Sequence, residues 1–316
     1  MPALTEPNER GQPETVGLIT PSYRGDLDRC ELLFESIDRH IAVRGQHYVI
    51  VHDEDVPLFE RFRRHDRQIL PVSAFLPQWL RHIPFLKWKG RQYWWTSQGW
   101  PISGWHSQQI VKIQAAASLP EQRFCIVDSD NVFFKDFDLA PLALPNSVPL
   151  HVYEGGIRAH RPRHMKWIET ASRLLGTVEP SFPADDYIDQ IIVWDQATVQ
   201  GMIARMESVS GRDWVAAMCR DRDFSEYMIY GAFVESSAAG AARHTRTSES
   251  FTRTHWDADE LSAADILAML RAATPRECAF CIQSFGSTPL ATIRTALAAF
   301  YSENSNAEQK IRMEAA

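Results

Sequence analysis

The sequence lacks both a surplus of positive charge and a long apolar run. Its 316 residues contain 33 Lys+Arg against 40 Asp+Glu, a formal charge of −7. A general nucleic-acid binder is therefore excluded, because no cations are left over to neutralise phosphates. The uncharged run at residues 139–153 is interrupted by three prolines and is too short to cross a bilayer. The polar, proline-rich amino terminus has no apolar segment of the secretory kind, so we expect no secretion.

Cysteine is also scarce, with five scattered residues. Only Cys278 and Cys281 lie close together, in a CxxC within a run that is typical of a strand. Residues three apart on a strand point to opposite faces, which suits neither a disulfide nor zinc. We expect buried or free thiols and a cytoplasmic protein. A lipid-linked substrate would place it at the inner face of the membrane, as a peripheral contact.

No Gly/Ser linker and no repeat of fixed period divides the chain. We expect a disordered amino terminus over 1–14, one catalytic domain over 15–303 and a polar tail over 304–316. Within the domain, a regular half over about 15–135 precedes a less regular half over about 136–303.

Apolar runs alternate with helical periodicity in the first half, which predicts an α/β fold whose mainly parallel central sheet is flanked by helices. Ser262 and Asp265 form a capping-box pattern ahead of a late helix. We expect strands at 16–20, 47–51, 124–127, 148–153 and 190–194, and helices at 28–40, 56–65, 108–118, 195–207 and 263–272.

The most informative segment is Arg123–Phe134, RFCIVDSDNVFF. An apolar strand delivers Asp128 and Asp130 to its carboxyl end, where ligands bind in open α/β sheets. Two carboxylates so close repel each other unless they share a hard divalent cation, and such a metal can bridge the phosphates of a nucleotide. The alternative is a solvated turn, although the apolar flanks favour a buried pair.

Three segments in this order resemble the GT-A glycosyltransferases, and more narrowly a group of poorly characterised bacterial proteins associated with polysaccharide and glycolipid synthesis. They are Trp105–Ile113 (WHSQQIVKI), Val127–Phe134 (VDSDNVFF) and Phe224–Gly231 (FSEYMIYG). The resemblance covers residues 16–285. It implies a GT-A-like nucleotide-sugar-binding fold, a divalent metal (Mn²⁺ or Mg²⁺), a nucleotide diphosphate sugar donor, which we expect to be a UDP-sugar, and a saccharide or lipid-linked acceptor.

On the metal side, the resemblance implies that Asp128 lies near the ribose and the metal, with Ser129 beside it, while Asp130 is the direct metal ligand. It also implies a late histidine ligand, for which His255 is the candidate. The alternative for His255 is a partly buried side chain next to Trp256.

On the nucleoside side, the turn after the first strand matches the place where the family holds the base and ribose. Thr20, Pro21 and Tyr23 are the candidates there, with Tyr23 available to stack on a base. Asp53, after the second strand, matches a position that recognises the uracil or ribose edge. Proline and aspartate are also ordinary turn residues, so a purely structural role stays open.

Gln109 and Lys112 are three residues apart and share a helix face. They can reach the sugar or the diphosphate, where a cation stabilises charge on the departing phosphate. Lys112 can equally sit on a solvated helix face.

Glu226 is the candidate for acid–base chemistry, because an inverting transfer needs a carboxylate to take the proton of the acceptor hydroxyl. Its aromatic neighbours favour a raised pKa. The alternative is a helix-start glutamate placed by the helix dipole. A retaining mechanism needs no such base, and we favour inversion only slightly.

Six of the ten tryptophans lie between residues 79 and 105, in a segment without a clean period. We expect a long ordered loop, and such loops tend to be functional. Tryptophan faces stack on sugars, and the local basic residues suit an acidic acceptor or an anionic membrane surface. Alternatively, the aromatics only anchor an irregular segment to the core.

Two other functions compete with glycosyl transfer. A haloacid-dehalogenase-type phosphohydrolase also carries DxD at a strand end, which Asp128 and Asp130 match, but that motif normally follows the first strand. A catalytically inactive, carbohydrate-binding GT-A protein is the non-enzymatic alternative.

Overall fold

The computed structural model describes residues 15–42, 45–88, 91–144, 146 and 148–314. The predicted disorder over 1–14 lies outside these residues. At the centre is a five-stranded sheet in the order β12-β7-β1-β2-β3. Its strands are β1 (Val16–Pro21), β2 (His47–Val51), β3 (Arg67–Pro71), β7 (Arg123–Val127) and β12 (Ile191–Asp195). All neighbours are parallel except β12, which runs antiparallel to β7.

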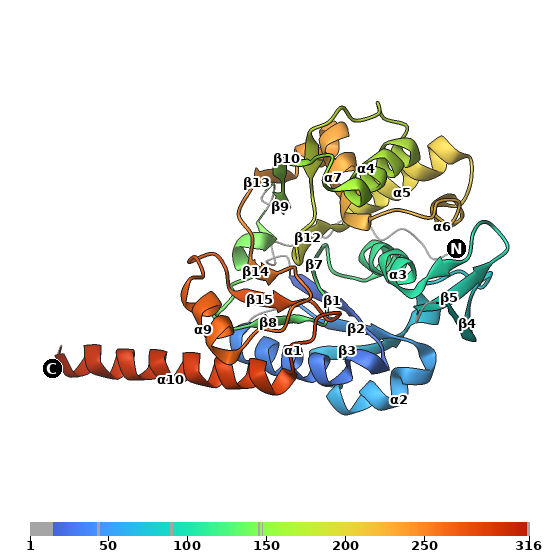
Figure 1. The fold of residues 1–316 in the computed structure, drawn as a ribbon. Helices are drawn as coiled ribbons and strands as arrows, with labels where there is room; N and C mark the ends of the chain where they lie inside the picture. Colours follow the sequence, from blue (N-terminus) through green and yellow to red (C-terminus); the bar gives the residue numbers. More distant parts are fainter. Residues whose placement is uncertain (1–14, 43–44, 89–90, 145, 147, 315–316) are drawn as a thin grey trace.

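Helices cover both faces of this sheet (Figure 1). The helices are α1 (Leu27–His40), α2 (Val56–Phe59), α3 (Gly104–Ser118), α4 (Pro162–Leu175), α5 (Gln196–Ser210), α6 (Trp214–Met218), α7 (Glu226–Ser236), α8 (Ala238–Ala241), α9 (Ala263–Arg271) and α10 (Leu290–Glu314). The α/β class with a mainly parallel central sheet is thus confirmed.

Alternation along the strands builds two cores. In β1, Leu18 faces a cluster that includes Leu33 and Phe34 of α1, whereas Ile19 faces a cluster that includes Ile110 of α3 and Met228 of α7. Successive strand residues point to opposite faces, so every strand of the sheet supplies both cores. The second cluster joins helices from both halves of the chain.

Most strands of the second half form small sheets. Strand β9 (Val148–His151) pairs with β13 (His244–Thr247), β10 (Tyr153–Ile157) pairs with β11 (Ala184–Asp186), and β8 (Asn131–Phe133), β15 (Ala279–Ile282) and β14 (Thr252–His255) form a three-stranded sheet. Both members of the CxxC are buried free thiols, as expected. The capping box of Ser262 and Asp265 at the start of α9 is confirmed.

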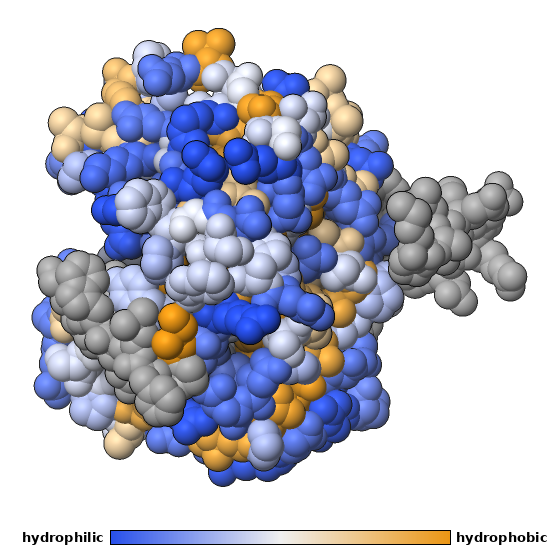
Figure 2. Space-filling view, turned by 90° about the vertical axis from the view of Figure 1, so that its right-hand side faces the viewer, coloured by the Kyte–Doolittle hydropathy of each residue, from blue (hydrophilic) through white to orange (hydrophobic). Residues whose placement is uncertain are grey.

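The tryptophan-rich segment is a sheet, so the expected loop was wrong. Strands β4 (Leu80–Trp88), β5 (Arg91–Thr96) and β6 (Ile102–Ser103) pair antiparallel. Because side chains alternate on a strand, Trp94 is buried against His52, with ring centroids 5.6 Å apart, while Trp95 is exposed. Figure 2 shows that the face at the right of Figure 1, where β4 and β5 lie, is mostly hydrophilic, with separate hydrophobic spots.

The chain ends in α10, which extends well beyond the body of the molecule (Figure 1). The predicted polar tail is part of this helix up to Glu314. Its first turns pack through Ile293, Leu297 and Phe300 against β8, β15 and α9. None of the described helices combines the length and the apolar character that a membrane crossing requires.

Candidate functional site

The carboxyl ends of β1 and β7 lie side by side, because Leu18 pairs with Cys125 and Ile19 with Ile126 in parallel register. From β1 the chain proceeds to β2 and β3 on one side, and later returns to β7 on the other. Such a reversal of strand order opens a crevice at the carboxyl ends, where ligands of α/β sheets bind. The turn with Asp128 and Asp130 follows β7 at this point.

Asp130 has an unsatisfied carboxylate. Its Oδ1 is buried and has no hydrogen-bond partner among the described residues, while Oδ2 accepts a long bond of 3.4 Å from the Ser284 amide and the Cys281 thiol lies beside the carboxylate. Burial, and then the negative charge of Asp128, raise the pKa of Asp130 to about 6. A buried oxygen of this kind normally has a partner, so the position is suited to a cation.

Asp26 is a third carboxylate beside this turn, and no sequence motif pointed to it. The Ser129 hydroxyl donates to Asp26 Oδ2 at 3.2 Å, which links the turn after β7 to the one after β1. Burial raises the pKa of Asp26, and the charge of Asp128 adds to the effect. The only sequence signal for Asp26 is its nearness to the end of the first strand.

Lys112 lies at the centre of a buried polar cluster and does not face solvent. Its Nζ is 2.8 Å from Asp128 Oδ1 and 3.0 Å from Glu226 Oε1, and it donates to the Tyr227 hydroxyl at 3.1 Å. Burial alone would lower the pKa of Lys112, but the charges of Asp128 and Glu226 outweigh it and hold that pKa well above the ordinary value. The solvated-face alternative for Lys112 is therefore wrong.

Glu226 begins α7 and is buried, with 3% of its side chain exposed. Its backbone amide donates to Gln109 Oε1 at 3.1 Å, so α3 holds the start of α7 directly. Burial raises the pKa of Glu226, and the nearby charge of Lys112 opposes that shift. Gln109 Nε2 is buried as well and has no partner in the described part of the chain. The structure thus brings together Gln109, Lys112, Asp128 and Glu226.

The residues around Asp130 fit a divalent cation. Asp130 offers an unpaired oxygen, and Asp26 is bonded to the neighbouring Ser129 of the same turn. Asp128 is already neutralised by Lys112. Hard cations prefer such carboxylate oxygens, so Asp130 would hold the ion, with Asp26 and Asp128 beside the same turn.

His255 lies in the neighbouring small sheet. Strand pairing sets His255 opposite Ile282 and Asn131 opposite Cys281, so the backbones of His255 and Asp130 are two strand spacings, roughly 10 Å, apart. His255 Nε2 is 3.0 Å from Asp259, and both lie close to Asp257. These three side chains are partly or fully exposed, and exposed acidic groups often gather without an ion.

The three nucleoside candidates at the end of β1 differ in how far they are exposed to solvent. Thr20 is buried, and its hydroxyl lies 3.0 Å from His47 Nε2. Pro21 ends the strand. Tyr23 is 39% exposed, and its ring covers Gly25 so closely that a Cβ there would lie 2.4 Å from it. Of the three, Tyr23 alone presents a ring to solvent.

Asp53 is on the surface after β2 and accepts hydrogen bonds from the amide and hydroxyl of Ser73. These bonds tie the end of β2 to the turn that follows β3. Asp53 thus stabilises the local backbone, and a nucleotide would have to compete with Ser73 for its carboxylate.

Comparison with known families gives one match. A family described as "Family of unknown function (DUF6492)" matches residues 14–305. No curated protein matches the chain. The description of the family names no activity, and the function has to be inferred from the geometry of the site.

Proposed function

Because the chain belongs to this DUF6492 family of unknown function, its activity must be inferred from its site, and we propose that it is a metal-dependent glycosyltransferase. The donor would be a nucleotide diphosphate sugar, a UDP-sugar, and the acceptor a saccharide or a lipid-linked saccharide. The observation that carries the proposal is the unpaired, buried Oδ1 of Asp130 at the carboxyl ends of β1 and β7. The bound metal would neutralise the diphosphate of the donor.

A GT-A-like fold is part of the same proposal. A mainly parallel central sheet and a DxD turn after β7, an internal strand of that sheet, support this part of the proposal. Tyr23 is the residue we propose to stack on the base, because its ring is exposed beside the turn.

The buried cluster suggests how the chain's own residues act. Glu226 would accept the proton of the acceptor hydroxyl as the new bond to the anomeric carbon forms, while the bond to the diphosphate breaks and its electron pair leaves with the phosphate. The raised pKa of Glu226 favours proton uptake. Lys112, bonded to Asp128 and Glu226, would hold the base at a fixed place relative to the donor.

Donor binding is tested by thermal unfolding with UDP, with and without Mn²⁺. We expect stabilisation only when both are present, about 2.7 kcal/mol at a hundredfold excess over Kd. Asp130→Ala should abolish it, whereas Asp136→Ala, which removes an aspartate with 92% of its side chain exposed, should not. A parent protein without a metal-dependent shift would contradict the proposal.

Glu226→Gln tests the chemistry separately. It keeps the shape of the side chain, so we expect donor binding to persist and transfer to cease. Loss of donor binding would instead assign Glu226 to the nucleotide site. Donor binding without turnover over a broad set of acceptors would favour an inactive carbohydrate-binding protein.

A phosphohydrolase is the second candidate, because an ammonium group lies within 3.0 Å of both oxygens of Asp128. Such a cation suits a carboxylate that attacks a phosphate. Release of inorganic phosphate from simple phosphoesters, lost in Asp128→Asn, would favour it over transfer.

A further inference from the structure

A basic segment outside the donor site leads into α4 and forms its first turn. Residues 158–166 read RAHRPRHMK, with four arginines and lysines and two histidines, in a chain with a formal charge of −7. The first turn of α4 contains no acidic residue. Cations near a helix amino terminus oppose the helix dipole, so helix stability does not account for these residues.

Arg163 lies against two tryptophans that come from different helices. Its guanidinium is 4.7 Å from the ring of Trp105, on α3, and 4.8 Å from that of Trp167, on α4. The two indoles are 5.4 Å apart. Trp105 and Arg163 are exposed, so an aromatic face and a cation are presented together to solvent.

Trp167 supplies an independent sign of a missing partner. It is 6% exposed, and its Nε1 has no hydrogen-bond acceptor among the residues that the structure describes. A buried indole N–H usually finds an acceptor. His164 packs on the same ring at 4.8 Å, so this indole lies directly beneath a residue of the basic segment.

Asp186 fixes part of the segment in place. Its Oδ2 is 2.9 Å from Arg161 Nη1 and 2.7 Å from His164 Nδ1. Burial alone would raise the pKa of Asp186, but the hydrogen bond and charge of His164 and the charge of Arg161 lower it. Arg158 bonds to a neutral carbonyl, that of Gly155. One buried acid therefore positions two basic side chains and leaves the segment cationic.

One face of α3 connects this surface to the buried Lys112 cluster. Trp105, Gln109 and Lys112 follow at i, i+4 and i+7 on one face of α3, and that face runs from an exposed indole to a buried ammonium. Next to Trp105, the His106 ring lies 4.5 Å from Phe224, two residues before Glu226.

We infer that Trp105, Arg163, Trp167 and the basic segment bind a saccharide that carries carboxylates, as the acceptor subsite of the transfer proposed above, on which this assignment rests. Indole faces stack on the CH faces of sugar rings. Arginine pairs with carboxylates in a bidentate manner. The α3 face then directs the acceptor towards Glu226.

The probe is a galacturonic acid hexasaccharide, compared by calorimetry with its fully methyl-esterified, neutral form. We expect the full chain to bind the acidic form about tenfold more tightly, the ratio of one charge-assisted pair. Arg163→Ala should weaken binding of the acidic form by a similar factor and remove most of the preference, and Trp105→Ala should weaken both forms. Arg163→Gln replaces Arg163→Ala if the latter does not fold.

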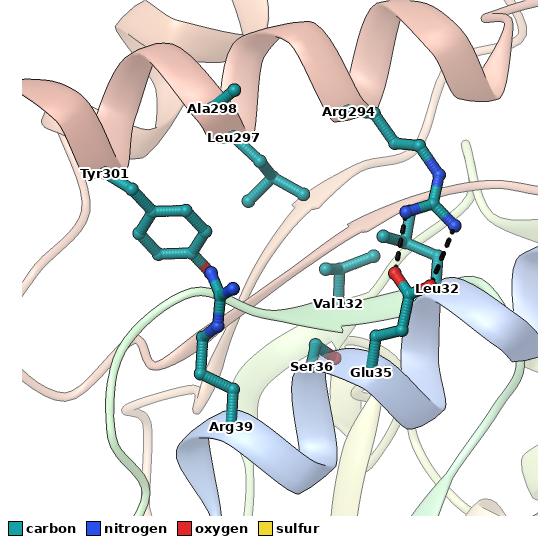
Figure 3. A pocket seen from close by; sticks show the side chains of 9 residues that line it. All are labelled: Leu32, Glu35, Ser36, Arg39, Val132, Arg294, Leu297, Ala298 and Tyr301. Carbon is teal, nitrogen blue, oxygen red and sulfur yellow. Dashed lines mark hydrogen bonds and ion pairs between the residues drawn. The ribbon is translucent and has the colours of Figure 1, made fainter.

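Arg39→Ala is the matched control. Arg39 on α1 lies 4.7 Å from the ring of Tyr301 on α10. Both residues line a pocket to which Leu32 and Leu297 also contribute (Figure 3). Arg39 is thus an exposed arginine over an aromatic ring, outside the proposed surface. Its loss should leave saccharide binding unchanged.

Three results would overturn the inference: no binding of the acidic probe, equal binding of the two forms, or an equal loss in Arg39→Ala. Binding to phosphatidylserine vesicles that depends on Arg163, without saccharide binding, would assign the surface to a membrane instead. The UDP and Mn²⁺ shift separates the two proposals. If that shift is absent and the acidic probe binds through Arg163, glycosyl transfer fails and the saccharide site stands; the reverse pattern overturns only the saccharide site.

Discussion

The two aspartates of the turn after β7 differ in how their charge is balanced. Asp128 is held by the ammonium of Lys112 at 2.8 Å, and Glu226 shares that cation. Asp130 has a buried oxygen without a partner in the described residues, and Asp26 adds a third carboxylate to the turn through its bond to Ser129. The charge of Asp128 is thus balanced within the folded chain.

On the other side of the turn, the unpaired oxygen of Asp130 is unfavourable for stability unless a cation binds it. Two residues apart in sequence, the side chains would therefore have opposite roles in the proposed function: Asp128 would contribute to the stability of the fold, and Asp130 would bind the metal. Active sites commonly hold such unfavourable groups at the expense of stability. The predictions below test this contrast.

Lys112→Met should have the largest effect. It leaves two carboxylates, Asp128 and Glu226, buried or half-buried without a cation, and breaking a buried pair from one side costs about 3–5 kcal/mol. Burial raises the pKa of Glu226 against the opposing charge of Lys112, so without Lys112 the loss should be largest above pH 7 and shrink as Glu226 takes up a proton on acidification. Urea unfolding at pH 8 and pH 5 measures it.

Lys166→Met is the control for that substitution. Lys166 is 64% exposed and lies 3.9 Å from Asp223, so its loss should change the free energy of unfolding by less than about 0.5 kcal/mol. A Lys112 variant as stable as this control would show that the cluster does not depend on its cation.

The central sheet could be predicted because its signals are local. The apolar runs of β1 and β7 and the periodicity of α1 each lie within one short window, and all three elements were confirmed. Strand β3 (Arg67–Pro71) was missed because it contains Arg67 and Gln68, and the helix expected over 56–65 ends in a single turn of 3-10 helix over Glu60–Phe62.

The site could be predicted only in part. Strand-end position singled out Asp128 and Asp130, but the bond from Lys112 to Glu226 joins residues 114 apart, and no local pattern encodes it. The sequence also placed positive charge near the tryptophans at 79–105, whereas the cation that contacts Trp105 is Arg163, from a distant helix. Contacts of this kind depend on how α3, α4 and α7 pack.

Asp130→Asn should stabilise the protein that lacks metal. The folded-state pKa of about 6 lies above the ordinary value of about 4, so the stability due to the protonated group is present below pH 4 and is lost as the pH rises through 6. The variant should gain about 1–3 kcal/mol at pH 8 and nothing at pH 4. Asp136→Asn, at an exposed position, should change little; a destabilised Asp130 variant at pH 8 would contradict the contrast.

The response to metal should depend on pH through the same carboxylate. Because a proton and Mn²⁺ compete for Asp130, apparent metal affinity should be level above pH 7 and fall about tenfold per pH unit below the pKa of about 6. The thermal shift by UDP and Mn²⁺ at pH 5, 6, 7 and 8 measures this, with UDP alone as the reference. A shift of constant size from pH 5 to pH 8 would exclude Asp130 as the ligand that titrates.

Tyr227→Phe should have the smallest effect, and it tests the Asp128 side of the turn. The hydroxyl lies 3.1 Å from Lys112 Nζ, and one hydrogen bond to a charged group contributes about 1–2 kcal/mol. Donor binding should stay unchanged, because the Tyr227 hydroxyl bonds to Lys112 and none of its described contacts involves Asp130. In a double-mutant cycle with Lys112→Met, the cost of removing the hydroxyl should vanish, because its partner is already gone. Additive costs would mean that the hydroxyl stabilises the fold independently of Lys112, and that the cation is held by its two carboxylates without the phenol.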